Sequence, residues 1–185
     1  MNETKKTALF IICDGVEELE AVAPIDILRR GGVDVTVASA GASKTVLGKN
    51  NITLGADISI TDLHSQIFDA LVFPGGPGVY TLRKDKRLPD IIQQHVAGDK
   101  WIAAICAAPT LLNDQGLLEG RRHTSHYVVK EELPNSIEDE AVVVDGKIIT
   151  SQGAGTAVAF GLKLVEVLTS SENSEEVARS ICVPG

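Results

Sequence analysis

Short apolar runs alternate with longer segments of mixed polarity along the 185-residue chain. The runs are rich in valine, isoleucine and alanine, which is typical of strands that are buried on both faces. The longer segments place apolar side chains three and four positions apart, as amphipathic helices do. This alternation predicts an α/β fold, in which a mostly parallel sheet lies between two layers of helices. We expect strands over 8–13, 33–38, 69–73 and 101–105, and helices over 18–30, 88–96, 107–112 and 156–169.

The first expected helix covers residues 18–30 and is followed by Gly31 and Gly32, which end it. Pro24 bends this helix or marks its true start, because proline lacks the N–H that a helix interior needs. We expect an apolar stripe to face the sheet, formed by Leu19, Val22, Ala23, Ile27 and Leu28.

Two hairpins are predicted. The segment over 41–62 is polar and dotted with glycine, and its weak alternation around 52–54 and 58–60 indicates a small hairpin outside the main sheet. Nearer the C-terminal end, apolar runs over 141–144 and 147–150 flank Asp145-Gly146, a favourable hairpin turn.

The composition limits the classes of function. Seventeen Lys and Arg stand against twenty-five Asp and Glu, and the net charge of -8 disfavours binding to nucleic acid or to anionic membranes. The first apolar run stops at Asp14, too early for a secretion signal, and no apolar stretch approaches the roughly 18 residues of a membrane span. We therefore expect one cytoplasmic domain over residues 1–185, with neither nucleic acid nor membrane as a partner.

The three cysteines, Cys13, Cys106 and Cys182, are far apart and form no C-x-x-C pair. No histidine lies beside them at metal-ligand spacing, so neither structural disulfides nor a metal site is expected. The glycines match neither G-x-G-x-x-G nor the P-loop, and no nucleotide cofactor is expected. Cys13 and Cys182 are interpreted as structural or incidental.

Cys106 directly follows the strand expected over 101–105 and precedes the helix expected over 107–112. Pro109 fits there because the first turn of a helix does not need its N–H. Such a turn resembles the nucleophile elbow, in which a strained backbone presents a reactive side chain. We expect the start of the helix to favour the thiolate of Cys106. The alternative is that Cys106 only fills space in the core.

Further groups reach the same edge of the sheet, where the carboxyl ends of parallel strands meet. The N–H of Ala107, together with that of Gly75 or Gly76, can hold an oxyanion beside Cys106. These glycines lie in the dense turn after the strand over 69–73. Their alternative role is simply to form a tight turn.

Acidic residues cluster at the start of the first helix: Glu17, Glu18 and Glu20. Acids there complement the helix dipole, which accounts for two of the three. One of them, placed beside a thiolate, would stay protonated and could move protons. His123 and His126 follow Cys106 within twenty residues and are alternatives for a base. No acid is placed to orient either ring, so a full triad is not predicted.

Four segments carry recognisable motifs: Gly15 to Val22 (GVEELEAV), Phe73 to Gly76 (FPGG), Ala103 to Thr110 (AAICAAPT) and Thr150 to Gly153 (TSQG). In this order they closely resemble the ThiJ/PfpI superfamily, over nearly the whole chain. The sequence looks most like the branch that includes the parkinsonism-associated protein and its glyoxalase, deglycase and redox-chaperone relatives. The Ala-Ile-Cys-Ala string is the specific part of the match.

This resemblance implies a flavodoxin-like sandwich that forms a homodimer, with Cys106 as the oxidisable nucleophile. It selects Glu20 from the three acids as the protonated partner that contacts the sulfur. His126 matches the family histidine near the cysteine. Gly76 and Ala107 match the family's backbone N–H donors.

Two further positions are assigned by the same resemblance. Arg30, at the end of the first helix, matches a residue near the dimer interface and the active site. Gly75 is grouped with it as a substrate-binding position.

The sequence also departs from the family pattern. The protease branch has histidine directly after the nucleophile, where this chain has Ala107, and this difference argues against peptidase activity. Gly153-Ala154-Gly155 stands where the family has Gly-Pro-Gly, which predicts a less rigid loop. Tyr127 stands where proline is common.

These residues predict a cysteine-dependent enzyme of the glyoxalase or deglycase type that needs no cofactor. Its substrates would be small reactive aldehydes such as methylglyoxal, or glycated protein. Its role would be protection against carbonyl and oxidative stress. The alternative is a redox sensor or chaperone that works through oxidation of Cys106. An amidase or protease is a minor alternative.

Overall fold

A seven-stranded sheet runs through the computed structural model, which describes residues 5–184. Its strand order is β5-β2-β1-β6-β7-β9-β8, and only the pair formed by β8 and β9 is antiparallel. The predicted α/β architecture is therefore confirmed. The strands are β1 (Thr7–Ile12), β2 (Asp34–Ser39), β5 (Ile58–Ser59), β6 (Ala70–Phe73), β7 (Trp101–Ile105), β8 (Val142–Asp145) and β9 (Ile148–Ser151).

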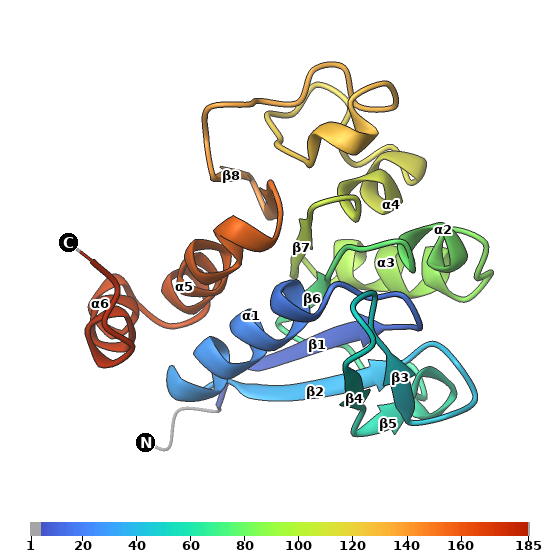
Figure 1. Cartoon of the computed structure of the whole chain (residues 1–185), viewed down its shortest axis with the longest axis horizontal. Coiled ribbons are helices and arrows are strands. Elements are labelled where there is room, and N and C mark those ends of the chain that lie inside the picture. The colour runs from blue at the N-terminus through green and yellow to red at the C-terminus, as the bar shows by residue number, and fades with distance from the viewer. Residues whose placement is uncertain (1–4, 185) are drawn as a thin grey trace.

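Helices cover both faces of this sheet (Figure 1). The connection from β1 through α1 to β2 moves toward one edge of the sheet, whereas the connection from β6 through α3 to β7 moves toward the other edge. Because both crossovers are right-handed, they place α1 and α3 on opposite faces of the sheet. Helix α5 packs against α1, and α6 packs against α5. The helices are α1 (Glu18–Arg30), α2 (Val79–Leu82), α3 (Leu88–Ala97), α4 (Pro109–Asp114), α5 (Ala157–Leu168) and α6 (Ser171–Ser180), with short 3-10 turns η1 (Ile60–Asp62), η2 (Tyr127–Val129) and η3 (Ala154–Thr156).

Strand β1 is the point at which the sheet changes direction. The chain adds β2 and β5 on one side of β1 and then returns to add β6 and β7 on the other. In open α/β sheets, ligands bind outside the carboxyl ends of the strands at such a switch point. The loops after β1 and β6, and Cys106 after β7, therefore share one edge of the molecule.

The predicted hairpin over 41–62 exists, but one of its strands was wrongly assigned. Strand β4 (Thr53–Gly55) pairs with β3 (Thr45–Leu47), whereas β5 joins the main sheet beside β2. Asp57 explains the difference, because its carboxylate accepts the N–H of Val37 at 2.8 Å and attaches this segment to the edge of β2. The second predicted hairpin, β8 with β9, is confirmed.

Helix α1 buries only part of the predicted apolar stripe. Leu19 and Val22 are 60% and 48% exposed, so these two members of the expected stripe face solvent. Ile27 and Leu28 are buried as predicted. The helix begins at Glu18 and contains Pro24 in its interior, so the proline does not mark the start.

The hydrophobic core lies on both sides of β1, β6 and β7. Large side chains from the sheet and from α5 are fully buried there: Phe10, Phe73, Phe160, Leu71 and Ile105. Within residues 5–184, no helix combines the length and apolar character needed to cross a membrane.

Candidate active site

Cys106 has the strained backbone expected of a nucleophile elbow. Its φ angle is +67°, in the left-handed region that side chains other than glycine rarely adopt. Its N–H donates to Ser151 O at 2.9 Å, and its carbonyl accepts the N–H of His126 at 2.9 Å. Both polar groups of its backbone are thus held by neighbouring segments, which keeps the strained conformation in place. Helix α4 then begins at Pro109, two residues after the predicted start at Ala107.

Glu20 lies directly against this thiol. It comes from the first turn of α1, is only 1% exposed, and its carboxyl lies beside the Cys106 side chain, so that each group shifts the pKa of the other. The N–H of Gly75 donates to Glu20 Oε2 at 2.9 Å. A β-carbon at Gly75 would lie 2.5 Å from that oxygen and 2.6 Å from Cys106 Cβ, so only glycine fits between the two.

Two backbone N–H groups act on the sulfur. Those of Gly76 and Ala107 lower the pKa of the Cys106 thiol, and they are the two groups that the sequence predicts as oxyanion donors. Gly76 has a φ angle of +93°, and a β-carbon there would lie 2.5 Å from Glu17 N. The absence of a side chain at Gly76 therefore allows the close approach that directs its N–H toward Cys106.

Burial perturbs both members of the Cys106–Glu20 pair. It raises the pKa of the Glu20 carboxyl from its usual 4.5 to about 7, although the hydrogen bond with Cys106 opposes the rise. Burial and the negative charge of Glu20 raise the pKa of the Cys106 thiol from 9.0 to about 12, while the N–H groups of Gly76 and Ala107 lower it.

These directions correct the expectation that the start of the helix would favour a thiolate. Helix α4 has only six residues, too few for a strong dipole, and the sulfur is shielded from water. Between the two pKa values, the pair holds one proton that can move between sulfur and carboxylate. Glu20 is therefore the base that can take the proton of Cys106 when the sulfur reacts.

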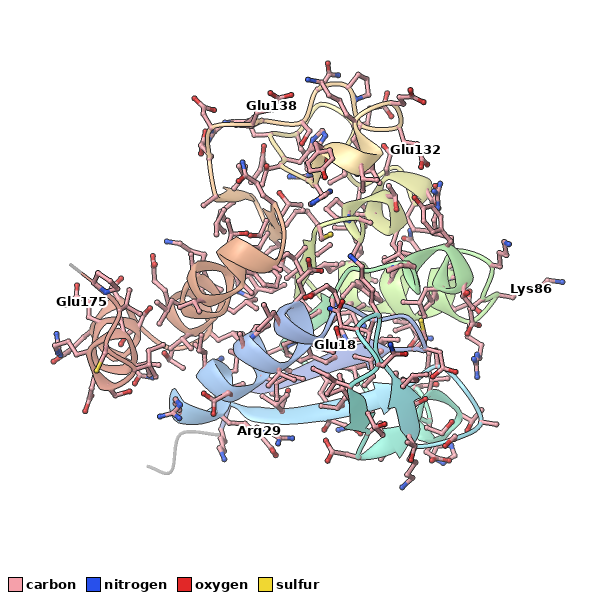
Figure 2. All side chains as sticks on the ribbon, viewed as in Figure 1. Glu18, Arg29, Lys86, Glu132, Glu138 and Glu175 are labelled. Atoms are coloured by element: carbon pink, nitrogen blue, oxygen red, sulfur yellow. The ribbon has the colours of Figure 1, made fainter. Side chains whose placement is uncertain are left out.

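The other two acids of the cluster are structural. Glu17 is the N-cap of α1, and its Oε2 accepts the N–H of Glu20 at 3.0 Å. Glu18 turns toward the β3–β4 hairpin (Figure 2), where its carboxylate accepts the N–H of Asn50 at 2.7 Å and that of Ile52 at 3.3 Å. The structure thus separates three adjacent acids into a cap, a hairpin anchor and a partner for the thiol.

His126 borders the pair on a third side. A β-carbon at Gly153 would lie 3.1 Å from the His126 ring and 3.7 Å from Glu20 Oε1, so the two side chains flank this glycine. Nδ1 of His126 accepts the N–H of Val128 at 3.2 Å, which leaves the proton of the neutral ring on Nε2. Burial lowers the pKa of His126, and the charge of Lys49 lowers it further. The ring is therefore placed as a hydrogen-bond donor rather than as the base that the sequence suggested.

Two of the expected residues lie apart from this group. His123 faces a separate cavity of about 330 Å³, and its Nδ1 donates to Arg121 O at 3.0 Å. Arg30 lies at the far end of α1, about 15 Å along the helix axis from Glu20. There it forms an ion pair with Asp26 at 2.6 Å. Within this chain, neither residue joins Cys106.

Lys49 is a residue near the site that the sequence did not indicate. It lies in the turn of the β3–β4 hairpin, and its N–H donates to Val16 O at 2.8 Å. Its charge acts on both Glu20 and His126. No motif marks this lysine, because a hairpin remote from Cys106 in sequence brings it to the site.

A cavity of about 600 Å³ opens beside His126 and Gly153. Its wall includes six polar side chains: Ser125, Lys130, Ser136, Glu138, Gln152 and Thr156. Glu138 lies at the outer loops in the upper part of Figure 2 and forms an ion pair with Lys130. Among residues 5–184, no three His, Cys, Asp or Glu side chains are grouped as metal ligands.

Comparison with known proteins identifies a family whose members resemble this chain in sequence. Residues 6–167 match the family model described as the DJ-1/PfpI family. Protein dj-1beta of Drosophila melanogaster is 38% identical over 182 residues, which cover 96% of this chain and 97% of that protein. The glutathione-independent glyoxalase DJR-1.2 of Caenorhabditis elegans is 32% identical over 183 residues, 97% of each chain.

Solved structures agree with these relatives. The crystal structure of Drosophila melanogaster DJ-1beta matches with a TM-score of 0.94 at 36% identity, over 98% of this chain and 100% of the other. Oxidized Toxoplasma gondii DJ-1 matches with a TM-score of 0.91 at 32% identity, over 96% of this chain and 98% of the other. The chain belongs to the DJ-1/PfpI family.

Proposed function

We propose that the protein is a glyoxalase-type enzyme that uses Cys106 and Glu20 to convert small α-oxoaldehydes, or their adducts on protein, into hydroxy acids without a cofactor. The observation that carries this proposal is the buried Glu20 carboxyl beside the Cys106 thiol, two groups whose pKa values are both raised by burial. The similarity to DJR-1.2 of Caenorhabditis elegans, which is named a glutathione-independent glyoxalase, supports the proposal. Protection against carbonyl stress in the cytoplasm stays a prediction from the sequence.

The reaction begins at the aldehyde carbon of a substrate such as methylglyoxal. The Glu20 carboxylate takes the proton of Cys106 while the sulfur attacks that carbon, and the carbonyl oxygen becomes an oxyanion. The N–H groups of Gly76 and Ala107 stabilise the oxyanion until it takes a proton from Glu20 and becomes a hemithioacetal. The Nε2–H of His126 donates to the neighbouring ketone oxygen.

Glu20 then moves a proton between the two adjacent carbons. It removes the proton on the carbon bound to sulfur, and the resulting enediol accepts a proton at the second carbon. The first carbon is oxidised to a thioester and the second is reduced to an alcohol, so no external oxidant or reductant is needed. Water hydrolyses the thioester, and lactate and the Cys106 thiol are released.

Conversion of methylglyoxal to lactate by the purified protein tests this proposal. Cys106→Ala should abolish turnover, and Glu20→Gln should reduce kcat by about 10²–10⁴-fold, the range typical of a lost general acid–base group. Cys182→Ala is the matched control, because Cys182 is exposed and outside the site. Wild-type turnover no greater than that of Cys106→Ala would refute the enzymatic proposal.

A second candidate function is peroxide sensing through the same thiol. The oxidized Toxoplasma gondii relative favours it, as does a pocket whose N–H groups suit the oxygens of an oxidised sulfur. Hydrogen peroxide would transfer one oxygen to Cys106 to give a sulfenic acid, and a second equivalent would give the sulfinic acid. The oxidised protein would then act as a chaperone or signalling partner.

Mass spectrometry after mild peroxide treatment separates this function from incidental oxidation. We expect Cys106 to gain two oxygens while Cys13 stays reduced, because Cys106 has the Glu20 carboxyl beside it to take its proton, whereas the buried thiol of Cys13 donates to Gly78 O. Cys182 should also stay reduced. Equal oxidation of all three cysteines would argue against a dedicated sensor.

The exposed apolar face of α1 supports a homodimer. Leu19 and Val22 lie on this face, and Leu47 and Ile52 of the hairpin are exposed as well. Glu18 holds the hairpin against the start of α1, so the four side chains belong to neighbouring elements. A second copy of the chain would cover them, and would bring its Arg30 toward the interface.

Light scattering tests the dimer. We expect a mass of twice 19.6 kDa for the wild type and a monomer for Leu19→Asp with Val22→Asp. Val96→Asp serves as the control, because Val96 is exposed on α3, away from this face. A monomeric wild type would contradict the assignment.

A further inference from the structure

The loops after β1 and β6 are joined by three hydrogen bonds. Glu17 N–H donates to Gly75 O at 3.0 Å, and Gly78 N–H donates to Gly15 O at 3.0 Å. The thiol of Cys13 donates to Gly78 O at 3.2 Å. The second loop supplies the Gly76 N–H, which lowers the pKa of the Cys106 thiol, so these bonds hold part of the candidate active site.

The contact between Cys13 and Gly78 is close. A β-carbon at Gly78 would lie 2.7 Å from Cys13 Sγ and 2.7 Å from Asp14 O. Any side chain at Gly78 would therefore push the two loops apart. Because Gly76 is only two residues away, a shift of Gly78 changes the direction of the Gly76 N–H.

Cys13 is placed to donate a hydrogen bond to Gly78 O. Burial raises the pKa of its thiol to about 11, and the charges of Asp14 and Asp85 contribute to the rise. The sulfur therefore keeps its proton at neutral pH. Cys13 also lines a cavity of about 850 Å³ together with Thr81, so a smaller side chain here would not leave a sealed void.

We propose that Cys13 is a positioning residue, whose S–H bond to Gly78 O holds the 75–78 loop where the Gly76 N–H can stabilise negative charge on Cys106. This inference deepens the proposed function, but it rests on the reactivity of Cys106 and not on the identity of the substrate. Cys13 thus assists the reactive thiol from the other side of the same loop.

The test measures alkylation of Cys106 by iodoacetamide as a function of pH, by mass spectrometry of the Cys106 peptide. We expect Cys13→Ala to slow alkylation at pH 7 by about tenfold and to move the midpoint of the profile upward, as expected for one weakened hydrogen bond to a developing anion. Cys13→Ser should restore the wild-type profile, because its hydroxyl can donate to Gly78 O. Cys182→Ala is the matched control.

Three results would overturn the inference: an unchanged profile in Cys13→Ala, a lower melting temperature with no change in the profile, or a Cys13→Ser profile that resembles that of Cys13→Ala. Should Cys13→Ala fail to fold, Cys13→Val removes the donor while keeping a buried side chain, and the same change is expected. A protein that converts no methylglyoxal but shows the expected change would refute the proposed function and leave this inference standing.

Discussion

Gly75 is the residue at which the parts of the candidate site come closest together. Its N–H donates to Glu20, its Cα faces Cys106, and a β-carbon would lie 2.8 Å from Ile105 O. Two of these neighbours, Cys106 Cβ and Ile105 O, cannot swing aside, and the carboxyl of Glu20 is buried and bound to the Gly75 N–H. The narrow space at this glycine therefore sets the distance between the acid and the thiol.

We expect Gly75→Ala to reduce turnover and Cys106 alkylation by about 100-fold or more, because misplacing reacting groups by about 1 Å has effects of that size. Gly155→Ala is the matched control. A β-carbon at Gly155 meets nothing within 4 Å, although the residue lines the cavity of about 600 Å³ beside His126. Equal activity of the two variants would contradict the close packing described around Gly75.

At the scale of elements, the side chain of Glu18 attaches the β3–β4 hairpin to α1, beside backbone bonds that join Leu47 and Lys49 to the preceding loop. Glu18 accepts both the backbone N–H and the side-chain amide of Asn50, the latter at 2.9 Å, together with the N–H of Ile52. This anchor keeps Lys49 near Glu20. The hairpin is thus a structural part of the site although no motif lies in it.

Removal of this anchor should loosen the hairpin. We expect trypsin to cleave after Lys49 faster in Glu18→Ala than in the wild type, because local opening exposes the backbone of the turn. Glu131→Ala, at an exposed position, should cleave at the wild-type rate. Identical cleavage in all three proteins would mean that other contacts hold the hairpin.

The strands could be predicted from the sequence more completely than the helix faces. Buried parallel strands leave continuous apolar runs, as in Trp101–Ile105, which the structure confirms residue for residue. Helix α1 misled the prediction because its buried face includes the acids Glu18 and Glu20, whereas Leu19 and Val22 face outward. Periodicity alone cannot show that the polar residues of a helix are the buried ones.

Helix α6 was missed for a related reason. Its segment, SENSEEVARS, is too polar to display an apolar stripe. Ser170 caps it by accepting the N–H of Asn173 at 3.1 Å, and Ser174 donates to Leu162 O of α5 at 2.8 Å. Tertiary contacts therefore support this helix more than its own composition does.

The candidate site shows the same division. Cys106 was predicted from the order of strand and helix, but Glu20 was separated from its two neighbours only by resemblance to a family. The role of Glu20 depends on its contact with Gly75, and that of Glu18 on its contact with Asn50, both of which are distant in sequence. The role of Glu17 depends on where α1 begins. Such contacts leave no local pattern.

At the scale of the whole molecule, a buried histidine links stability to pH. His95 is 1% exposed, accepts the N–H of Phe68 at 3.1 Å on Nε2, and contacts Ile91 O at 2.8 Å through Nδ1. Both bonds require a neutral ring with its proton on Nδ1. Burial lowers the pKa of His95 below 6.5, in agreement with this state.

Because the folded state lowers this pKa, the contribution of His95 to stability is complete above pH 6.5 and is lost as the pH falls through the folded pKa. We expect the melting temperature to fall between pH 7 and pH 5 more steeply in the wild type than in His95→Gln, which can keep both bonds without titrating. Parallel curves for the two proteins would show that His95 is not responsible.

The pH dependence of Cys106 alkylation, in the wild type and in Glu20→Gln, tests the central claim that these two residues act as one unit. The wild-type rate should rise with pH to a plateau, with a midpoint between 4.5 and 9.0 and close to the pKa of about 7 that burial gives Glu20. Glu20→Gln should lose this step, react more slowly at pH 8, and keep accelerating into the alkaline range. Superimposable profiles for the two proteins would contradict the account, because the thiol would then react without its carboxyl partner.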